Sequence, residues 1–147
     1  MQYEILTTPH QFTLHGKSSA VAEGCYGEVG FKLMNEMWRI FKEAKTPNKG
    51  LNHWVYLPDG RMFSGVELEP SVTTPKELES LSFELSRYLK HVHIGPYQLL
   101  PEKWKSLKAE IAARGDTIGD YSLEIYGHHC ADPAKAETTI LISLVSN

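Results

Sequence analysis

The segments Gly95-Pro96-Tyr97 and Glu124-Ile125-Tyr126, with a helical stretch between them, decide the fold because they repeat an earlier part of the chain. The earlier copy consists of Gly24-Cys25-Tyr26, another helical stretch and Trp54-Val55-Tyr56, 70 to 71 positions upstream. The second copy has a carboxylate where the first has an indole. Two such units packed together would bring one acid and several aromatic rings to a shared groove, which suits a flat, cationic small molecule.

The first copy spans about residues 11–69 and predicts a strand, a helix and a hairpin. Residues 11–22 are rich in Phe, Thr, Leu and Val, which is typical of a strand. Residues 53–57 and 62–68 flank Asp59-Gly60, a step that favours the tight reversal of a β-hairpin. Between them, apolar residues at intervals of three and four predict an amphipathic helix with the stripe Val29, Leu33, Met34, Met37, Trp38, Phe41 and Ala44.

The second copy spans about residues 78–145 and follows the same order. Before it, residues 74–77 resemble a capping box and predict a short helix or turn. We expect a strand at 83–94, a helix from Pro101 to Gly115, and strands at 122–126 and 138–145. The expected architecture is a single α+β domain over residues 1–147. In it, duplicated strand-helix-strand-strand modules form an antiparallel sheet with helices on one side and a ligand groove between the modules.

Composition and charge argue against several classes of protein. The 147 residues, 41% of them hydrophobic, suffice for one core, and the net charge of −3 is spread evenly over the chain. Neither half is a polycation, so we expect no direct binding to nucleic acid. The N-terminus has no basic stretch before an apolar run, and no 18 consecutive residues are apolar, which predicts a soluble cytoplasmic protein with no membrane contact. Two cysteines, Cys25 and Cys130, are too few for a disulfide framework.

Three segments carry a family resemblance: His93-Ile94-Gly95-Pro96-Tyr97, a tryptophan-bearing helix that ends at Gly115, and Leu123-Glu124-Ile125-Tyr126. Together they resemble the second half of the GyrI-like small-molecule-binding domain. That domain is also the effector-binding domain of multidrug-responsive and AraC-type transcription regulators. The resemblance extends over residues 11–145 and implies a duplicated module that binds bulky, often cationic and aromatic compounds. It also implies a pocket-floor glutamate at Glu124.

The resemblance leaves three functions open. Many relatives carry a DNA-reading domain, but the first expected strand begins near Gln11 and leaves no room for one. A standalone protein that binds or sequesters aromatic, cationic small molecules is therefore the leading interpretation. One branch of the family hydrolyses cyclopropane-bearing genotoxins with a glutamate and aromatic residues, and in such an enzyme Glu124 would be catalytic. Other standalone relatives protect a topoisomerase, which makes a protein partner the third alternative.

The residues alone also indicate a binding role for Glu124. Residues i and i+2 of a strand share a face, so Glu124 and Tyr126 point the same way, as do Trp54 and Tyr56. A desolvated carboxylate attracts a cation strongly, and each Trp or Tyr face adds about 0.5 to 2 kcal/mol by cation–π contact. The alternative is that Glu124 lies on the solvent face of an ordinary strand.

The aromatic residues divide into core and groove. Trp38, Phe41 and Trp104 fall on helical stripes and are expected in the core. Glu67 and Glu69 offer a second acid for the groove, although a solvated strand edge is the simpler interpretation. The expected ligand contacts, on strands or at helix entrances, are Trp54, Tyr56, Tyr97 and Tyr126, with Tyr26 and Tyr88 as weaker candidates.

We expect no metal and no cofactor. His91 and His93 share a strand face and residues 128–130 gather two histidines and a cysteine near Asp132, but the spacing matches no zinc motif. A glycine-rich run lies at the entrance of the first helix, yet no Lys-Ser/Thr pair follows it. The run, Gly24, Gly27 and Gly30, therefore indicates turn flexibility rather than a phosphate loop.

Overall fold

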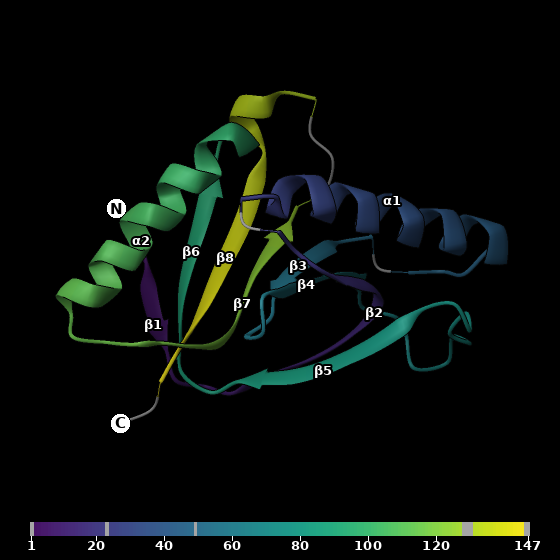
Figure 1. Ribbon diagram of the computed structural model, residues 1–147, viewed down its shortest axis with the longest axis horizontal. Helices are drawn as coiled ribbons and strands as arrows, with labels where there is room; N and C mark the ends of the chain where they lie inside the picture. The colour runs from purple at the N-terminus through teal and green to yellow at the C-terminus, as the bar shows by residue number, and fades with distance from the viewer. Residues whose placement is uncertain (1, 23, 49, 128–130, 146–147) are drawn as a thin grey trace.

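In the described part of the chain, eight strands form one sheet and two α-helices pack on it (Figure 1). The computed structural model describes residues 2–22, 24–48, 50–127 and 131–145. All neighbouring strands are antiparallel, in the order β1-β6-β8-β7-β3-β4-β2-β5, which confirms the α+β prediction. The elements are β1 Glu4–Leu6, β2 His10–Ala20, α1 Tyr26–Ala44, β3 Asn52–Tyr56, β4 Arg61–Val66, β5 Glu79–Leu85, β6 Tyr88–Ile94, η1 Tyr97–Leu99, α2 Leu100–Ala113, β7 Ile118–Tyr126, η2 Pro133–Lys135 and β8 Glu137–Leu144.

The two halves of the chain follow the same path through the sheet. The first half places its strands in the order β3-β4-β2, and the second places its strands in the order β7-β8-β6. The halves meet where β3 pairs with β7. At the outer edges, β1 extends the second half by pairing with β6, and β5 extends the first by pairing with β2. The middle of the sheet is therefore a junction between two units of similar topology.

Both helices cover the same face of the sheet, but over different halves of it. α1 packs on β2 and β4, where Phe41 joins a buried cluster, and α2 packs on β6 and β8 through Leu107. Across the strands, Ile140 lies opposite Glu124, and Glu124 in turn lies opposite Trp54. Ile140 packs beneath α2, and Trp54 packs beneath α1. Side chains directly opposite each other share a face, so all three face the helices. The junction strands β3 and β7 thus lie between α1 and α2.

The other face of the sheet buries a second core to which none of the described helices contributes. The ring of Phe83, on the edge strand β5, stacks on Phe12 at 5.1 Å and on Tyr121 at 4.7 Å between ring centroids. Three strands separate β5 from β7, which carries Tyr121, so the sheet must curl for these rings to meet. The cluster comprises Phe12, Leu14, Val55, Phe63, Phe83, Leu85, Tyr88, Leu123 and Leu141.

Residues 83–94 do not form the single strand that we predicted. A two-residue bend separates the end of β5 at Leu85 from the start of β6 at Tyr88. Arg87, in this bend, donates hydrogen bonds of 2.8 and 3.2 Å to the two carboxylate oxygens of Asp116. Its carbonyl also accepts a 2.9 Å hydrogen bond from the Leu144 amide. These contacts fix the bend, so β5 joins the first half of the sheet and β6 the second.

The shorter predicted elements have mixed outcomes. The hairpin at Asp59-Gly60 is confirmed: the Leu57 amide donates to the Arg61 carbonyl at 3.0 Å, and Gly60 has a φ of 77°. Residues 74–77 form a turn rather than a helix, closed by a 3.1 Å hydrogen bond from the Leu78 amide to Pro75. The strand β1 was not predicted, because three residues are too short for a periodic pattern.

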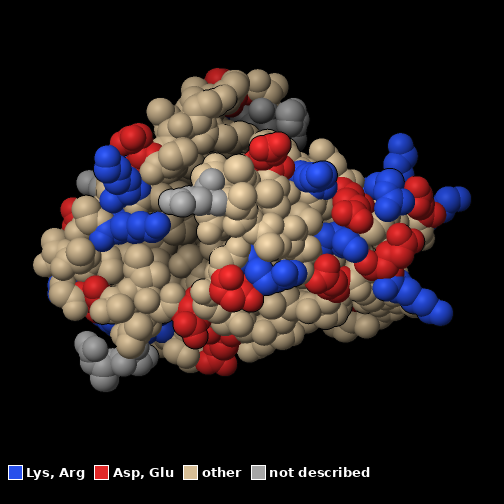
Figure 2. Space-filling view, viewed as in Figure 1, with Lys and Arg blue, Asp and Glu red and all other residues tan. Residues whose placement is uncertain are grey.

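Charged side chains of both signs are interspersed on the face shown in Figure 2, most densely over the C-terminal end of α1. The middle of that face is largely uncharged. Among the described residues, no helix is long and apolar enough to cross a membrane.

Candidate functional site

A cavity of about 950 Å³ lies over the junction strands, where neither helix covers the sheet. Both helices contribute to its walls, β3 and β7 form its floor, and Tyr97 lies at its mouth. The lining residues are Tyr26, Gly27, Phe31, Met34, Trp38, Asn52, Trp54, Tyr56, Leu57, Pro58, Tyr97, Leu100, Pro101, Trp104, Lys108, Ile118, Gly119, Asp120, Ser122, Glu124, Tyr126 and Gly127. This volume is sufficient for a drug-sized ligand.

The register of the β3–β7 pair decides which side chains form the floor. Trp54 lies opposite Glu124, and this is the middle pair of the five in the ladder. Two positions away on either side, Asn52 lies opposite Tyr126 and Tyr56 lies opposite Ser122. Because alternate residues of a strand share a face, all six side chains point into the cavity.

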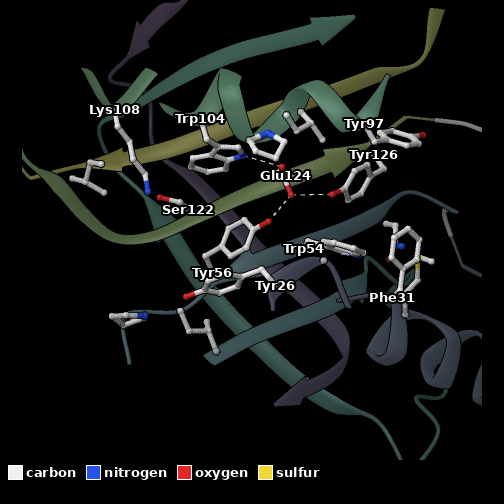
Figure 3. Close-up of a pocket in the computed structure, with 18 of the residues that line it drawn as sticks. Tyr26, Phe31, Trp54, Tyr56, Tyr97, Trp104, Lys108, Ser122, Glu124 and Tyr126 are labelled. Atoms are coloured by element: carbon white, nitrogen blue, oxygen red, sulfur yellow. Dashed lines mark hydrogen bonds between the residues drawn. The ribbon is translucent and has the colours of Figure 1, made fainter. Parts of the chain in front are cut away.

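Three hydrogen-bond donors converge on the Glu124 carboxylate (Figure 3). The Tyr56 and Tyr126 hydroxyls donate to Oε1 at 2.6 and 2.9 Å. The indole Nε1 of Trp104 donates to Oε2 at 2.8 Å. Glu124 is only 3% exposed, and a carboxylate has about four acceptor positions, so these donors satisfy most of its hydrogen-bonding capacity. All three donors are neutral, so the negative charge of the carboxylate is held in place and is not cancelled.

The two tyrosines that contact Glu124 stay protonated at physiological pH. Burial, reinforced by the neighbouring Glu124 charge, raises the pKa of the Tyr56 hydroxyl well above its usual value. The pKa of Tyr126 is raised for the same reasons. Both hydroxyls therefore remain hydrogen-bond donors, and neither adds a second negative charge beside the carboxylate.

The aromatic rings of the cavity meet edge to face, and the contacts repeat between the two halves. Tyr26 packs on Tyr56 at 5.3 Å and 75°, while Tyr97 packs on Tyr126 at 5.5 Å and 84°. These are the aromatic positions that the sequence repeat relates to each other. Tyr26 and Tyr97 are 39% and 47% exposed, so the outer ring of each pair lies at the cavity mouth.

Trp54 belongs to both the cavity and the core. It lines the cavity, yet it is only 5% exposed and packs with Leu33 in a buried cluster. The Trp54 ring can pack here because residue 30 on α1 is a glycine. A Cβ at Gly30 would lie 2.6 Å from the ring. Phe31, the next residue on α1, meets the same ring edge-on at 5.4 Å.

The structure brings most of the sequence-predicted contacts together. Glu124, Trp54, Tyr56, Tyr97, Tyr126 and Tyr26 all line the cavity. Tyr88 does not line it. Its neighbour Leu89 faces α2, so Tyr88 points to the opposite face of the sheet, where it is buried in the core cluster. Glu67 also lies away from this cavity, with His53 Nε2 at 3.7 Å from its carboxylate, and neither Glu67 nor Glu69 lines the cavity.

Trp104, which we expected in the core, packs against the buried cluster beneath α2, but its ring also lines the cavity and its Nε1 donates to Glu124. Trp38, also expected in the core, lines the cavity while packing on Phe41 at 5.9 Å. Sequence reasoning also missed Phe31, Met34, Lys108, Asp120 and Ser122. Lys108 follows Trp104 by four positions on α2, so the spacing contained a signal for that pair.

The candidate metal residues have other contacts in the structure. His93 Nε2 lies 3.1 Å from the Pro96 carbonyl, and His91 Nδ1 contacts the Gln2 carbonyl. Among the described residues, no three His, Cys, Asp or Glu side chains are grouped closely enough to hold a metal ion. Residues 128–130 lie outside the described part of the chain.

Neither a protein-family model nor a curated protein sequence matches the chain, but many solved structures share its fold. One is EcmrR in a complex with DNA, with a TM-score of 0.71, 13% identity and coverage of 99% of this chain. The chain spans 58% of that protein. Another is SAV2435 bound to tetraphenylphosphonium, with a TM-score of 0.67, 15% identity and coverage of 99% and 95% of the two chains. A hydrolase from Listeria innocua has a TM-score of 0.57 and 13% identity, and the match covers 98% of this chain and 92% of the hydrolase chain.

Proposed function

We propose that this chain, which has the fold of the GyrI-like small-molecule-binding domains, binds bulky aromatic cations in the cavity between α1 and α2. The observation that carries the proposal is the buried Glu124 carboxylate at the floor of an aromatic cavity. Tyrosine and tryptophan faces attract a cation by their quadrupoles, and the carboxylate adds a full negative charge where little water competes. A delocalised cation suits this site better than a compact ammonium, because removing the delocalised cation from water costs less free energy.

The geometry favours binding over a purely structural role for Glu124. A buried carboxylate is costly to desolvate, and no described cationic side chain forms an ion pair with it. Its three donors are neutral, so a ligand cation would provide the missing counter-charge. The solved structure of SAV2435 with tetraphenylphosphonium, a bulky aromatic cation, supports this reading of the cavity.

The test replaces Glu124 with its neutral isostere. Glu124→Gln keeps the shape of the floor but removes its charge, so a cationic dye such as rhodamine 6G should bind more weakly by about 1.5 to 3 kcal/mol, or at least tenfold. A neutral polycyclic dye of similar size should be nearly unaffected. Fluorescence anisotropy titration measures both affinities. Equal losses for the cationic and the neutral dye would contradict the electrostatic account.

A second candidate function is hydrolysis of an electrophilic small molecule. Asp120 provides a second carboxylate lining the cavity, and a hydrolase is among the proteins of the same fold. In this case Glu124 would orient or deprotonate a water molecule, and the Tyr56 and Tyr126 hydroxyls would polarise the leaving group. Turnover of cyclopropane-bearing substrates that falls by about 10² to 10⁴-fold in Glu124→Gln would support the hydrolase. Absence of turnover in the wild-type protein would reject it.

A further inference from the structure

One end of the cavity differs in charge from the rest. Figure 3 shows Lys108 and Ser122 at the end of the cavity away from Tyr97. Lys108 follows Trp104 by four residues on α2, so it lies about 6 Å further along the helix on the same face. Its ammonium lies over the Trp104 ring, 5.9 Å from the centroid. The Trp104 indole therefore donates a hydrogen bond to Glu124 through Nε1 and has the Lys108 ammonium over the face of its ring.

The Lys108 ammonium is available to a ligand. Of the described residues that line the cavity, Lys108 has the one cationic side chain, and no described carboxylate forms an ion pair with it. The Trp104 face holds it by cation–π attraction and accepts none of its hydrogen bonds. An ammonium has three donors and no acceptor, so it can bind an anionic or hydrogen-bond-accepting group of a ligand.

Asp120 precedes Ser122 by two residues in the chain. It lies in β7 where the register with β8 shifts between Ile118 and Ser122, and it lines the same cavity. A register shift of this kind turns side chains away from their regular alternation. The Asp120 charge opposes an incoming anion, whereas the Lys108 charge attracts one. Their opposite effects allow the two contributions to be separated by mutation.

We infer that the Lys108 end of the cavity is a subsite for an anionic or hydrogen-bond-accepting arm. The preferred ligand is a zwitterionic aromatic molecule, with a delocalised cation near Glu124 and a carboxylate about one helical turn, or 6 Å, further along α2. This inference rests on the proposed function, because it places the cation of the ligand at Glu124. A ligand with a second positive charge at that position would be repelled by Lys108.

Two dyes that share one chromophore test the subsite. Rhodamine 6G is an ethyl ester, and its free acid, rhodamine 19, keeps the same xanthene cation but carries a carboxylate that is ionised at neutral pH. The measured quantity is the ratio of the dissociation constant of the ester to that of the acid, from anisotropy titrations. Lys108→Met keeps an apolar stem over Trp104 and removes the ammonium. The ratio should fall about three- to tenfold, mainly because the acid binds more weakly.

Matched variants separate the subsite from a general charge effect. Lys105→Met removes the same charge from an exposed position on the same helix outside the cavity, and it should leave the ratio unchanged. Asp120→Asn should raise the ratio, because the acid loses an opposing charge. If Lys108→Met and Lys105→Met change the ratio equally, or if neither changes it, the subsite does not exist.

The Glu124→Gln variant distinguishes failure of the inference from failure of the proposed function. Weaker binding of both dyes to Glu124→Gln, with an unchanged ratio in Lys108→Met, would leave the cation site standing and overturn the subsite. No effect of Glu124→Gln on either dye would contradict the proposed function itself. No binding of either dye to the wild-type protein would overturn both.

Discussion

Trp54 and Glu124 lie directly opposite each other in the β3–β7 ladder, at the point where the two halves of the sheet meet. On either side of this pair the halves supply equivalent groups, since Tyr56 and Tyr126 both donate to the same carboxylate oxygen. At the central pair the halves differ, with an indole on one strand and a carboxylate on the other. The duplicated fold therefore gives an almost symmetric aromatic cavity, and the difference at its centre adds a negative charge to that cavity.

The contact between Gly30 and Trp54 leads to the first prediction. Gly30→Ala should destabilise the protein by about 1 to 3 kcal/mol, because the new Cβ would lie 2.6 Å from the indole ring and force it to shift. The shift should also weaken dye binding, since the same ring lines the cavity. Urea denaturation and anisotropy titration measure the two effects.

Gly27 is the matched control for the effect on stability. It lies one turn earlier on α1, and a Cβ there would meet no atom within 4 Å. Gly27→Ala should therefore be neutral or stabilise the helix by up to about 1 kcal/mol. Equal destabilisation by the two alanine variants would show that helix packing on the Trp54 ring is not the cause.

The second prediction concerns Trp38, which the sequence analysis assigned to the core, and Trp54, which it assigned to the groove, because both line the cavity and Trp54 is the more buried. Trp54→Ala should destabilise the protein by about 3 to 5 kcal/mol, because the ring is 5% exposed and joins a core cluster. Trp38→Ala should destabilise it less, because that side chain is half-buried. Both variants should weaken dye binding. A larger loss of stability in Trp38→Ala than in Trp54→Ala would contradict this order.

The sequence predicted the α+β fold and the centre of the site because both follow from strand alternation within a repeat. The repeat aligned Trp54-Val55-Tyr56 with Glu124-Ile125-Tyr126. Alternation placed the first and third residues of each segment on one face of its strand. The role of Trp104 could not be obtained in this way. Its helical stripe indicates a buried face, but not whether a residue at its margin packs on the sheet or leans into a gap between two helices.

Tyr88 shows a second limit of the sequence. Its orientation depends on which face of β6 meets α2, and alternation gives the relative but not the absolute direction of side chains. The bend at Arg87 depends on a contact with Asp116, 29 positions away, which no local pattern contains.

The third prediction concerns pH and the buried His53. Burial lowers the pKa of His53 below its usual value of 6.5, although the Leu51 carbonyl and Glu67 act in the opposite direction. The unfolded chain therefore binds a proton at this residue at a higher pH than the folded protein does. The free energy of unfolding should fall as the pH decreases from about 6.5 toward the folded pKa, with a slope of at most about 1.4 kcal/mol per pH unit from this group.

His53→Asn tests this assignment, because asparagine retains a donor for the Leu51 carbonyl, 3.1 Å from Nδ1, but does not titrate. Urea denaturation at a series of pH values should show a shallower slope below pH 6.5 in the variant than in the wild-type protein. Identical slopes in the two proteins would assign the acid sensitivity to other groups.

The last prediction separates holding Glu124 in place from contacting the ligand. Trp104→Phe keeps an aromatic ring but removes the Nε1 donor, so Oε2 loses its 2.8 Å hydrogen bond. Because the carboxylate is 3% exposed, the loss should destabilise the folded protein by about 1 to 3 kcal/mol. The negative charge of the carboxylate remains, so the affinity for rhodamine 6G should change by less than about threefold, in contrast to the tenfold or greater loss in Glu124→Gln. Denaturation and anisotropy titration of the same samples give both quantities. An affinity loss in Trp104→Phe as large as that in Glu124→Gln, with little loss of stability, would mean that the indole itself is the main ligand contact.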